Sequence, residues 1–164
     1  MAFETTILLS QAVCIFFLAA WLTTGVFENL AHSRLNSTFT AEVMAMTRMK
    51  EDFPEAFEDV AYRRVLNPNV QKFFFGLIVL VEIVASTLLW IGFIALVMAL
   101  LGDADVSVAR SLAVLGVLAF ISVWAGFLVG GNWFCYWFCH EAAQNTHYQM
   151  TLWGLGTLVL LAAG

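Results

Sequence analysis

The chain has 164 residues, of which 62% are hydrophobic and only 12% are charged, and its formal net charge is −5. Soluble domains carry about twice that share of charged residues, so the composition excludes an ordinary soluble domain and indicates a membrane protein. The negative charge argues against a nucleic-acid partner, because binding to a phosphate backbone needs clustered Lys and Arg.

Four apolar runs are predicted to cross the membrane, at about residues 7–27, 73–101, 108–130 and 146–163. A helix needs about 20 apolar residues to span a bilayer, and the fourth run reaches that length only with help from the preceding turn. Short connections favour antiparallel neighbours. We therefore predict a single all-α domain, a polytopic bundle of four transmembrane helices.

Residues 28–72 form a long charged loop between the first two runs. Apolar residues at helical spacing predict a short helix from Thr40, as N-cap, to Met49. Pro54 ends that helix, and a second is predicted from Glu55 to Val65. These helices either cap the bundle or lie in the membrane interface.

The basic residues predict the orientation of the chain. All but one of the Lys and Arg residues lie in the 28–72 loop, and the exception is Arg110. Cytoplasmic loops are enriched in Lys and Arg. The loop is therefore predicted to be cytoplasmic, with both termini outside.

Glu82 is the only charged residue in the second run. A carboxylate at membrane depth is rare and costs several kcal/mol unless it is paired or protonated. It is expected to face protein, either as a proton relay or ligand anchor or as a simple interhelical hydrogen-bond partner. The polar residues available to it at membrane depth are Gln11, Ser86, Thr87, Ser122 and Asn132.

Aromatic residues gather after the third run, where Trp133, Phe134 and Trp137 follow the pair Gly130-Gly131. Together with Trp90 in the second run, they are candidates for contact with lipid or a partner subunit. Trp and Tyr are enriched at the headgroup level of membranes, which favours an interfacial belt. The alternative is an aromatic pocket for a quinone, a lipid tail or a pigment.

Three histidines, His32, His140 and His147, are the candidate haem ligands. A bis-His haem b would need two of them to face each other from different helices. A lone interfacial His is more often hydrogen-bonded or solvated, so we expect neither haem nor a metal. The sequence has no complete catalytic motif, and we expect no enzyme activity and no catalytic residue.

Several of these residues also resemble a family pattern. The chain is similar to the bacterial "predicted small integral membrane protein" family, a four-helix domain of unknown function. The resemblance rests on Asn36-x-x-Phe39-x-x-x-Val43-x-x-Met46, Arg64-x-x-x-Pro68, Glu82 and Gly130-Gly131-x-Trp133-Phe134-x-x-Trp137. Asn132 stands where the family pattern has Glu. The resemblance implies a bacterial inner membrane and no established activity.

The predicted function is that of a non-catalytic accessory subunit of a larger membrane complex, in respiratory or photosynthetic energy conversion. Its partners would be lipids and other integral membrane subunits. One alternative is a subunit that binds a cofactor or quinone. Another is a small transporter or channel that uses Glu82.

Overall fold

The computed structural model describes residues 2–163, and its regular elements are all helical. In chain order they are α1 (Phe3–Ala31), α2 (Arg34–Ala45), α3 (Thr47–Asp52), α4 (Pro54–Val60), the 3₁₀ turn η1 (Ala61–Arg63), α5 (Pro68–Leu101), α6 (Val106–Trp133) and α7 (Glu141–Ala162). The all-α prediction is therefore confirmed for the described residues.

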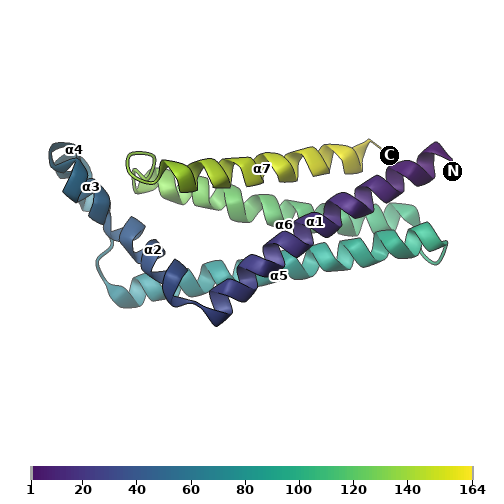
Figure 1. The fold of residues 1–164 in the computed structure, drawn as a ribbon, viewed down its shortest axis with the longest axis horizontal. Coiled ribbons are helices and arrows are strands. Elements are labelled where there is room, and N and C mark those ends of the chain that lie inside the picture. The colour runs from purple at the N-terminus through teal and green to yellow at the C-terminus, as the bar shows by residue number, and fades with distance from the viewer. Residues whose placement is uncertain (1, 164) are drawn as a thin grey trace.

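The four long helices lie along one axis, and α2, α3 and α4 gather at one end of them (Figure 1). The first turn of α1 and the last turn of α7 lie at the opposite end of the bundle (Figure 1). Helices α5 and α6 pack closely, α1 packs mainly on α5, and α7 packs mainly on α6. Helix α1 crosses the others obliquely, so it approaches α7 near the termini and diverges from it toward α2 (Figure 1).

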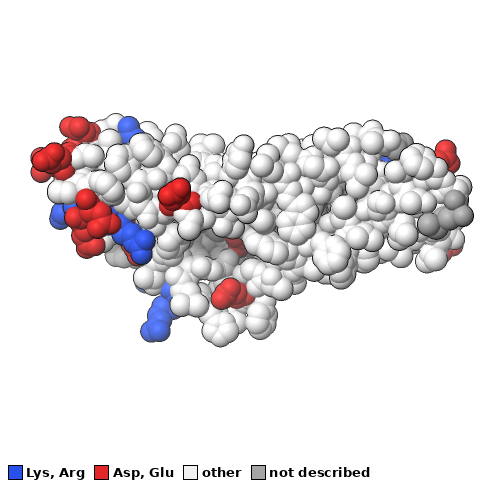
Figure 2. All heavy atoms as spheres, turned by 45° about the horizontal axis from the view of Figure 1, so that its top comes forward, with Lys and Arg blue, Asp and Glu red and all other residues white. Residues whose placement is uncertain are grey.

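Among the described residues, three helices are long and apolar enough to cross a membrane: α1, α5 and α6. Helix α7 lies beside α6, but polar residues such as Glu141, Gln144 and Asn145 fill its first turns and lower its hydropathy. The charged side chains gather around α2–α4, and the middle of the molecule is nearly free of them on the face that Figure 2 shows. This distribution is typical of an integral membrane protein.

Local sequence signals define the ends of α5 and α6. Asn67 caps α5 by accepting a hydrogen bond from the Asn69 backbone N–H, and Pro68 occupies its first turn. Asp105 caps α6 by accepting one from Val108. Between them, Gly102 ends α5 at φ +87°, a conformation that glycine adopts without steric cost. The tight turn makes α5 and α6 antiparallel neighbours.

Two glycines set the distance between α5 and α6. A Cβ on Gly92 would lie 2.6 Å from the Ala113 Cα, and a Cβ on Gly116 would lie 2.9 Å from the Leu88 carbonyl oxygen. Small residues allow helix backbones to approach closely in membranes. The core of the bundle therefore forms where these two helices meet, with α1 packed against them.

The helices of the 28–72 loop differ from the prediction. The helix predicted from Thr40 to Met49 is wrong, because α2 begins at Arg34 and ends at Ala45. Met46 then has φ 53° and breaks the chain into α2 and α3. Its side chain is buried with Met49 and Phe57, so tertiary packing stabilises this turn despite the steric cost of φ > 0.

Candidate functional site

Glu82 lies in the middle of α5 and is only 5% exposed. The Asn29 side-chain amide on α1 donates a hydrogen bond to Glu82 Oε2 over 2.7 Å. The Asn36 amide on α2 donates in turn to Asn29 Oδ1 over 2.6 Å. This chain of side chains, which we call the Glu82 network, ties α5, α1 and α2 together. No Lys, Arg or His among the described residues forms an ion pair with Glu82.

A cavity of about 950 Å³ lies beside the Glu82 network. Helices α1, α2, α5 and α6, the turn after α6 and the first turns of α7 all contribute to its wall. The lining residues of each long helix lie in the half of the bundle next to α2, where α1 and α7 diverge (Figure 1). The surface is hollowed on this side of the molecule, with acidic atoms in and beside the hollow (Figure 2).

The wall of the cavity is mainly apolar and rich in aromatic rings. The aromatic side chains come from the four long helices, α2 and the α6–α7 turn: Trp21, Phe39, Phe74, Phe75, Trp124, Phe127, Trp133, Phe134, Tyr136 and His147. Small-molecule sites typically have volumes of about 300–1,000 Å³, apolar walls and a few polar groups. This cavity meets that description at the upper end of the volume range.

The cavity lining contains acidic residues and no basic Lys or Arg side chain. The acidic residues are Glu82 and Glu28. Glu28 is exposed, whereas Glu82 is buried. A buried carboxylate without a cationic partner is costly, so this arrangement favours a neutral or cationic occupant over an anionic one.

Trp124 lines the same cavity and is 7% exposed. Its ring packs against Trp21 and Phe127, with centroids 5.1 and 5.5 Å away. Within residues 2–163, its indole Nε1 is buried and has no hydrogen-bond acceptor. A buried indole N–H usually finds a partner, so this donor is suited to an acceptor on a bound molecule.

Tyr136 and His147 form a polar pair in the cavity wall. Tyr136 Oη and His147 Nδ1 are 2.5 Å apart, and the two rings are stacked. His140 stacks on Tyr136 as well. A Cβ on Gly131 would lie 2.5 Å from the Tyr136 ring, so glycine at this position leaves room for it.

The turn that carries Tyr136 and His140 lies outside the long helices. Burial raises the pKa of Tyr136 to about 12. Burial also lowers the pKa of His140 below its usual value, an effect that outweighs the opposing influence of Glu42. Both groups are therefore held in their uncharged forms near neutral pH.

Four of the polar residues predicted as partners of Glu82 have other hydrogen-bond partners. Gln11 is buried near the chain termini, where its amide donates to the Leu160 carbonyl and its Oε1 accepts from Arg110. Ser86 shares a hydrogen bond with Thr23. Ser122 and Thr87 bond to their own helices. These contacts join helices or satisfy single turns, and none of them reaches Glu82.

Asn132 is exposed at the end of α6, so it does not pack between helices. Trp133 is 53% exposed and lies under the Arg63 guanidinium, and Trp137 is 50% exposed. Phe134 is half-buried at the edge of the cavity. Trp90 has a more specific place, because its Nε1 donates to Thr23 across the α1–α5 contact.

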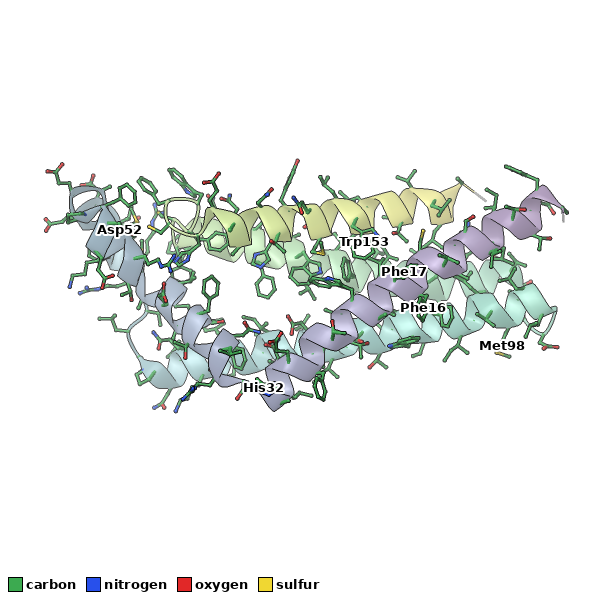
Figure 3. All side chains as sticks on the ribbon, viewed as in Figure 1. Phe16, Phe17, His32, Asp52, Met98 and Trp153 are labelled. Atoms are coloured by element: carbon green, nitrogen blue, oxygen red, sulfur yellow. The ribbon has the colours of Figure 1, made fainter. Side chains whose placement is uncertain are left out.

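The histidines do not form a bis-His pair between helices. His32 is exposed at the end of α1, well away from the first turns of α7 (Figure 3). His140 and His147 both stack on Tyr136. No group of three His, Cys, Asp or Glu suited to a metal ion occurs in residues 2–163. The expectation that the chain binds no haem stays a prediction.

Sequence reasoning does not place Asn29 or Trp124 in the site, and it names Asn36 only as part of the family pattern. Asn29 follows the first apolar run and was not considered as a partner of Glu82, which lies 53 residues away. The seven-residue spacing of Asn29 and Asn36 was an available signal, because both are amides near the predicted membrane boundary.

The fold and the cavity together define a small polytopic helical membrane protein. The profile of the predicted small integral membrane protein family (DUF2165) matches residues 7–163. The chain belongs to this family, as the resemblance predicted. No curated protein and no solved structure matches the chain.

Proposed function

We propose that this membrane protein binds an apolar small molecule with a polar head in the cavity beside Glu82. The observation that carries the proposal is the cavity itself, about 950 Å³ in volume, with an apolar aromatic wall and a buried carboxylate. The unpaired Trp124 Nε1 supports it, because a bound molecule would supply the missing acceptor. The apolar body of the ligand would lie against the aromatic wall.

The location of the cavity favours binding over conduction. Its lining residues all lie in the half of the bundle next to α2. A channel would need a polar path through the other half as well, where the core is formed by close packing of α5 and α6. The quinone-binding alternative fits this proposal, and the channel alternative has less support.

A matched pair of glycines tests the proposal. A Cβ on Gly126 or on Gly76 meets no atom within 4 Å, and both residues are exposed on long helices. Gly126 lines the cavity and Gly76 does not. Gly126→Leu should therefore fill the cavity, while Gly76→Leu serves as the control.

The experiment measures the thermal stability of the purified full chain in detergent, with and without a decyl-chain benzoquinone as a neutral amphipathic probe. A ligand that binds the folded state raises Tm with concentration. We expect the probe to raise Tm for the wild type and for Gly76→Leu. Gly126→Leu should show no such rise in Tm. An equal rise in all three proteins, or no rise in any, would contradict the proposal.

A second candidate is the predicted role as an accessory subunit of a bacterial inner-membrane complex for energy conversion. In the most apolar window of each candidate span, only 33–39% of the residues are buried within the chain. The remaining surface is available to lipid or to other subunits. Ligand binding in the cavity is compatible with contact to either one. Solubilisation in mild detergent tests this candidate, because migration of the native chain as a lone protein–detergent particle would contradict it.

The finer topology also belongs to the proposal. We propose α7 as the fourth span, because it lies beside α6 and its 22 residues extend about 33 Å at about 1.5 Å per residue. Packing on α6 would then compensate for its polar first turns, which face the α2 end of the bundle. The α2–α4 segment would be cytoplasmic, with both termini outside.

A further inference from the structure

We propose that the cavity is a site for a lipophilic organic cation, with Glu82 as its counter-ion. This inference rests on the proposed binding function and specifies its ligand class. It commits to a small molecule with a delocalised or substituted positive charge on an apolar body.

The first argument is charge complementarity. The cavity is lined by two carboxylates and by no Lys or Arg. Glu82 receives one hydrogen bond from a neutral amide and forms no ion pair within residues 2–163. An anionic head would be repelled by both carboxylates. A cation would instead supply the positive partner that a buried carboxylate needs.

The second argument is the chemistry of the wall. Trp21 and Trp124 meet edge to face, with centroids 5.1 Å apart, and Phe127 packs on Trp124. The faces of Trp, Tyr and Phe attract organic cations, and aromatic cages are a common site for quaternary ammonium groups. A wall of this kind stabilises a weakly hydrated cation better than it stabilises a small hydrated ion such as Na⁺.

The third argument is the construction of the Glu82 network. Asn29 on α1 donates a hydrogen bond to one oxygen of Glu82, and Asn36 on α2 holds Asn29 in place by donating to its Oδ1. Glu82 nevertheless still contributes to the cavity wall. A carboxylate needed only for helix association would gain nothing from lying beside a cavity, but an anchored counter-ion requires both features.

The test compares two probes of closely similar shape and opposite charge, tetraphenylphosphonium and tetraphenylborate. Binding to the full chain in detergent is measured by equilibrium dialysis, with protein-free micelles subtracted. We expect tetraphenylphosphonium to bind more tightly than tetraphenylborate by at least about tenfold, which corresponds to about 1.4 kcal/mol. Gly126→Leu should lose this binding and Gly76→Leu should retain it.

Variants of the carboxylate identify the counter-ion. Glu82→Gln keeps a hydrogen-bond acceptor for Asn29 but removes the charge, so tetraphenylphosphonium binding should weaken by about tenfold or more. Glu82→Asp should retain most of the binding. Glu4→Gln makes the same change of net charge at an exposed site near the opposite end and should behave as wild type. If Glu82→Gln does not fold, the two probes and Glu82→Asp still decide the question.

The outcomes separate this inference from the proposed function. If the neutral benzoquinone binds in the cavity and tetraphenylphosphonium does not, the cation inference is overturned and the binding function remains. Failure of both probes overturns both proposals. Equal tetraphenylphosphonium binding by the wild type and Glu82→Gln overturns the role of Glu82 as the counter-ion.

Discussion

At the scale of single residues, the hydrogen bond between Asn29 and Glu82 joins α1 to α5. Glu82 is 5% exposed and Asn29 is 7% exposed, so both side chains are buried. Interhelical hydrogen bonds in membranes are nevertheless worth only about 0.6–1.7 kcal/mol, because the separated helices also find partners. The hydrogen bond is therefore expected to contribute only modestly to the stability of the fold. Its main effect is to hold Glu82 beside the cavity.

A double-mutant cycle measures this contact. Asn29→Ala, Glu82→Ala and the double variant are compared by unfolding in detergent. The coupling between the two positions should be about 0.6–1.7 kcal/mol. The control pairs Glu82→Ala with Thr87→Ala, whose hydroxyl bonds only to the Ile83 carbonyl of its own helix. Additive effects at Asn29 and Glu82, like those expected of the control, would show that the hydrogen bond contributes nothing.

Tyr136 provides a second prediction at this scale. Its pKa is raised to about 12 by burial, whereas an unfolded tyrosine ionises near pH 10. Because the neutral form is favoured in the folded state, its contribution to stability is complete below about pH 10. That contribution is lost as the pH rises through about 12.

Ultraviolet titration of tyrosinate in the wild type and Tyr136→Phe checks this prediction. The difference between the two curves should have its midpoint near pH 12. Tyr62→Phe, which removes a phenol that is 74% exposed, controls for the loss of one tyrosine. A difference curve for Tyr136 with a midpoint near pH 10 would show that the phenol is not buried in the folded protein.

At the scale of helices, two glycines determine how closely α5 and α6 approach. Gly92 faces the backbone of Ala113 and Gly116 faces that of Leu89, with Cβ positions 2.6 and 2.9 Å from the opposing Cα atoms. Backbone atoms cannot move aside as the end of a flexible side chain can. The pairing of these helices also fixes the position of Glu82 relative to the cavity wall contributed by α6.

Gly92→Ala and Gly116→Ala are expected to destabilise the protein by about 1–3 kcal/mol each, because overpacking forces the two backbones apart. Gly76→Ala is the matched control, since its Cβ meets no atom within 4 Å. That control should be neutral or more stable by up to about 1 kcal/mol, through the higher helix propensity of Ala. Thermal unfolding in one detergent gives all three values, and equal Tm values would contradict the close approach.

At the scale of the whole molecule, most of the basic residues and the cavity lie toward the same end of the bundle. Apart from Arg110, the described Lys and Arg residues gather at the α2–α4 end (Figure 2). Arg110 donates a hydrogen bond to Gln11, which in turn bonds to Leu160 near the end of α7. The cavity is next to the α2–α4 end. Under the proposed topology, a ligand would therefore reach Glu82 from the cytoplasmic half of the membrane.

Labelling with a membrane-impermeant maleimide checks this topology. Lys50→Cys and Asp103→Cys are introduced into a chain whose three native cysteines have been replaced, and both positions are exposed. In intact cells, the reagent should label position 103 and leave position 50 unlabelled until the membrane is opened. Labelling of position 50 from outside would reverse the orientation.

The sequence alone determined the class of this protein, the three most apolar helices and the special position of Glu82. Asn67, Asp105 and Gly102 carry local signals, which act through backbone groups within a few residues. These features depend on composition and on short-range geometry, so they can be predicted without knowing how the helices pack. The break at Met46 could not be predicted in this way, because its buried contacts with Met49 and Phe57 override the local preference for φ < 0.

Only the tertiary structure decided the partner of Glu82 and the existence of the cavity. Helix α5 is apolar around its whole circumference, so periodicity does not indicate which side faces α1. The contact with Asn29 depends on how α1 crosses α5, and the cavity depends on the divergence of α1 from α7. These are properties of packing between segments that are distant in the chain, and an apolar sequence restricts packing only weakly.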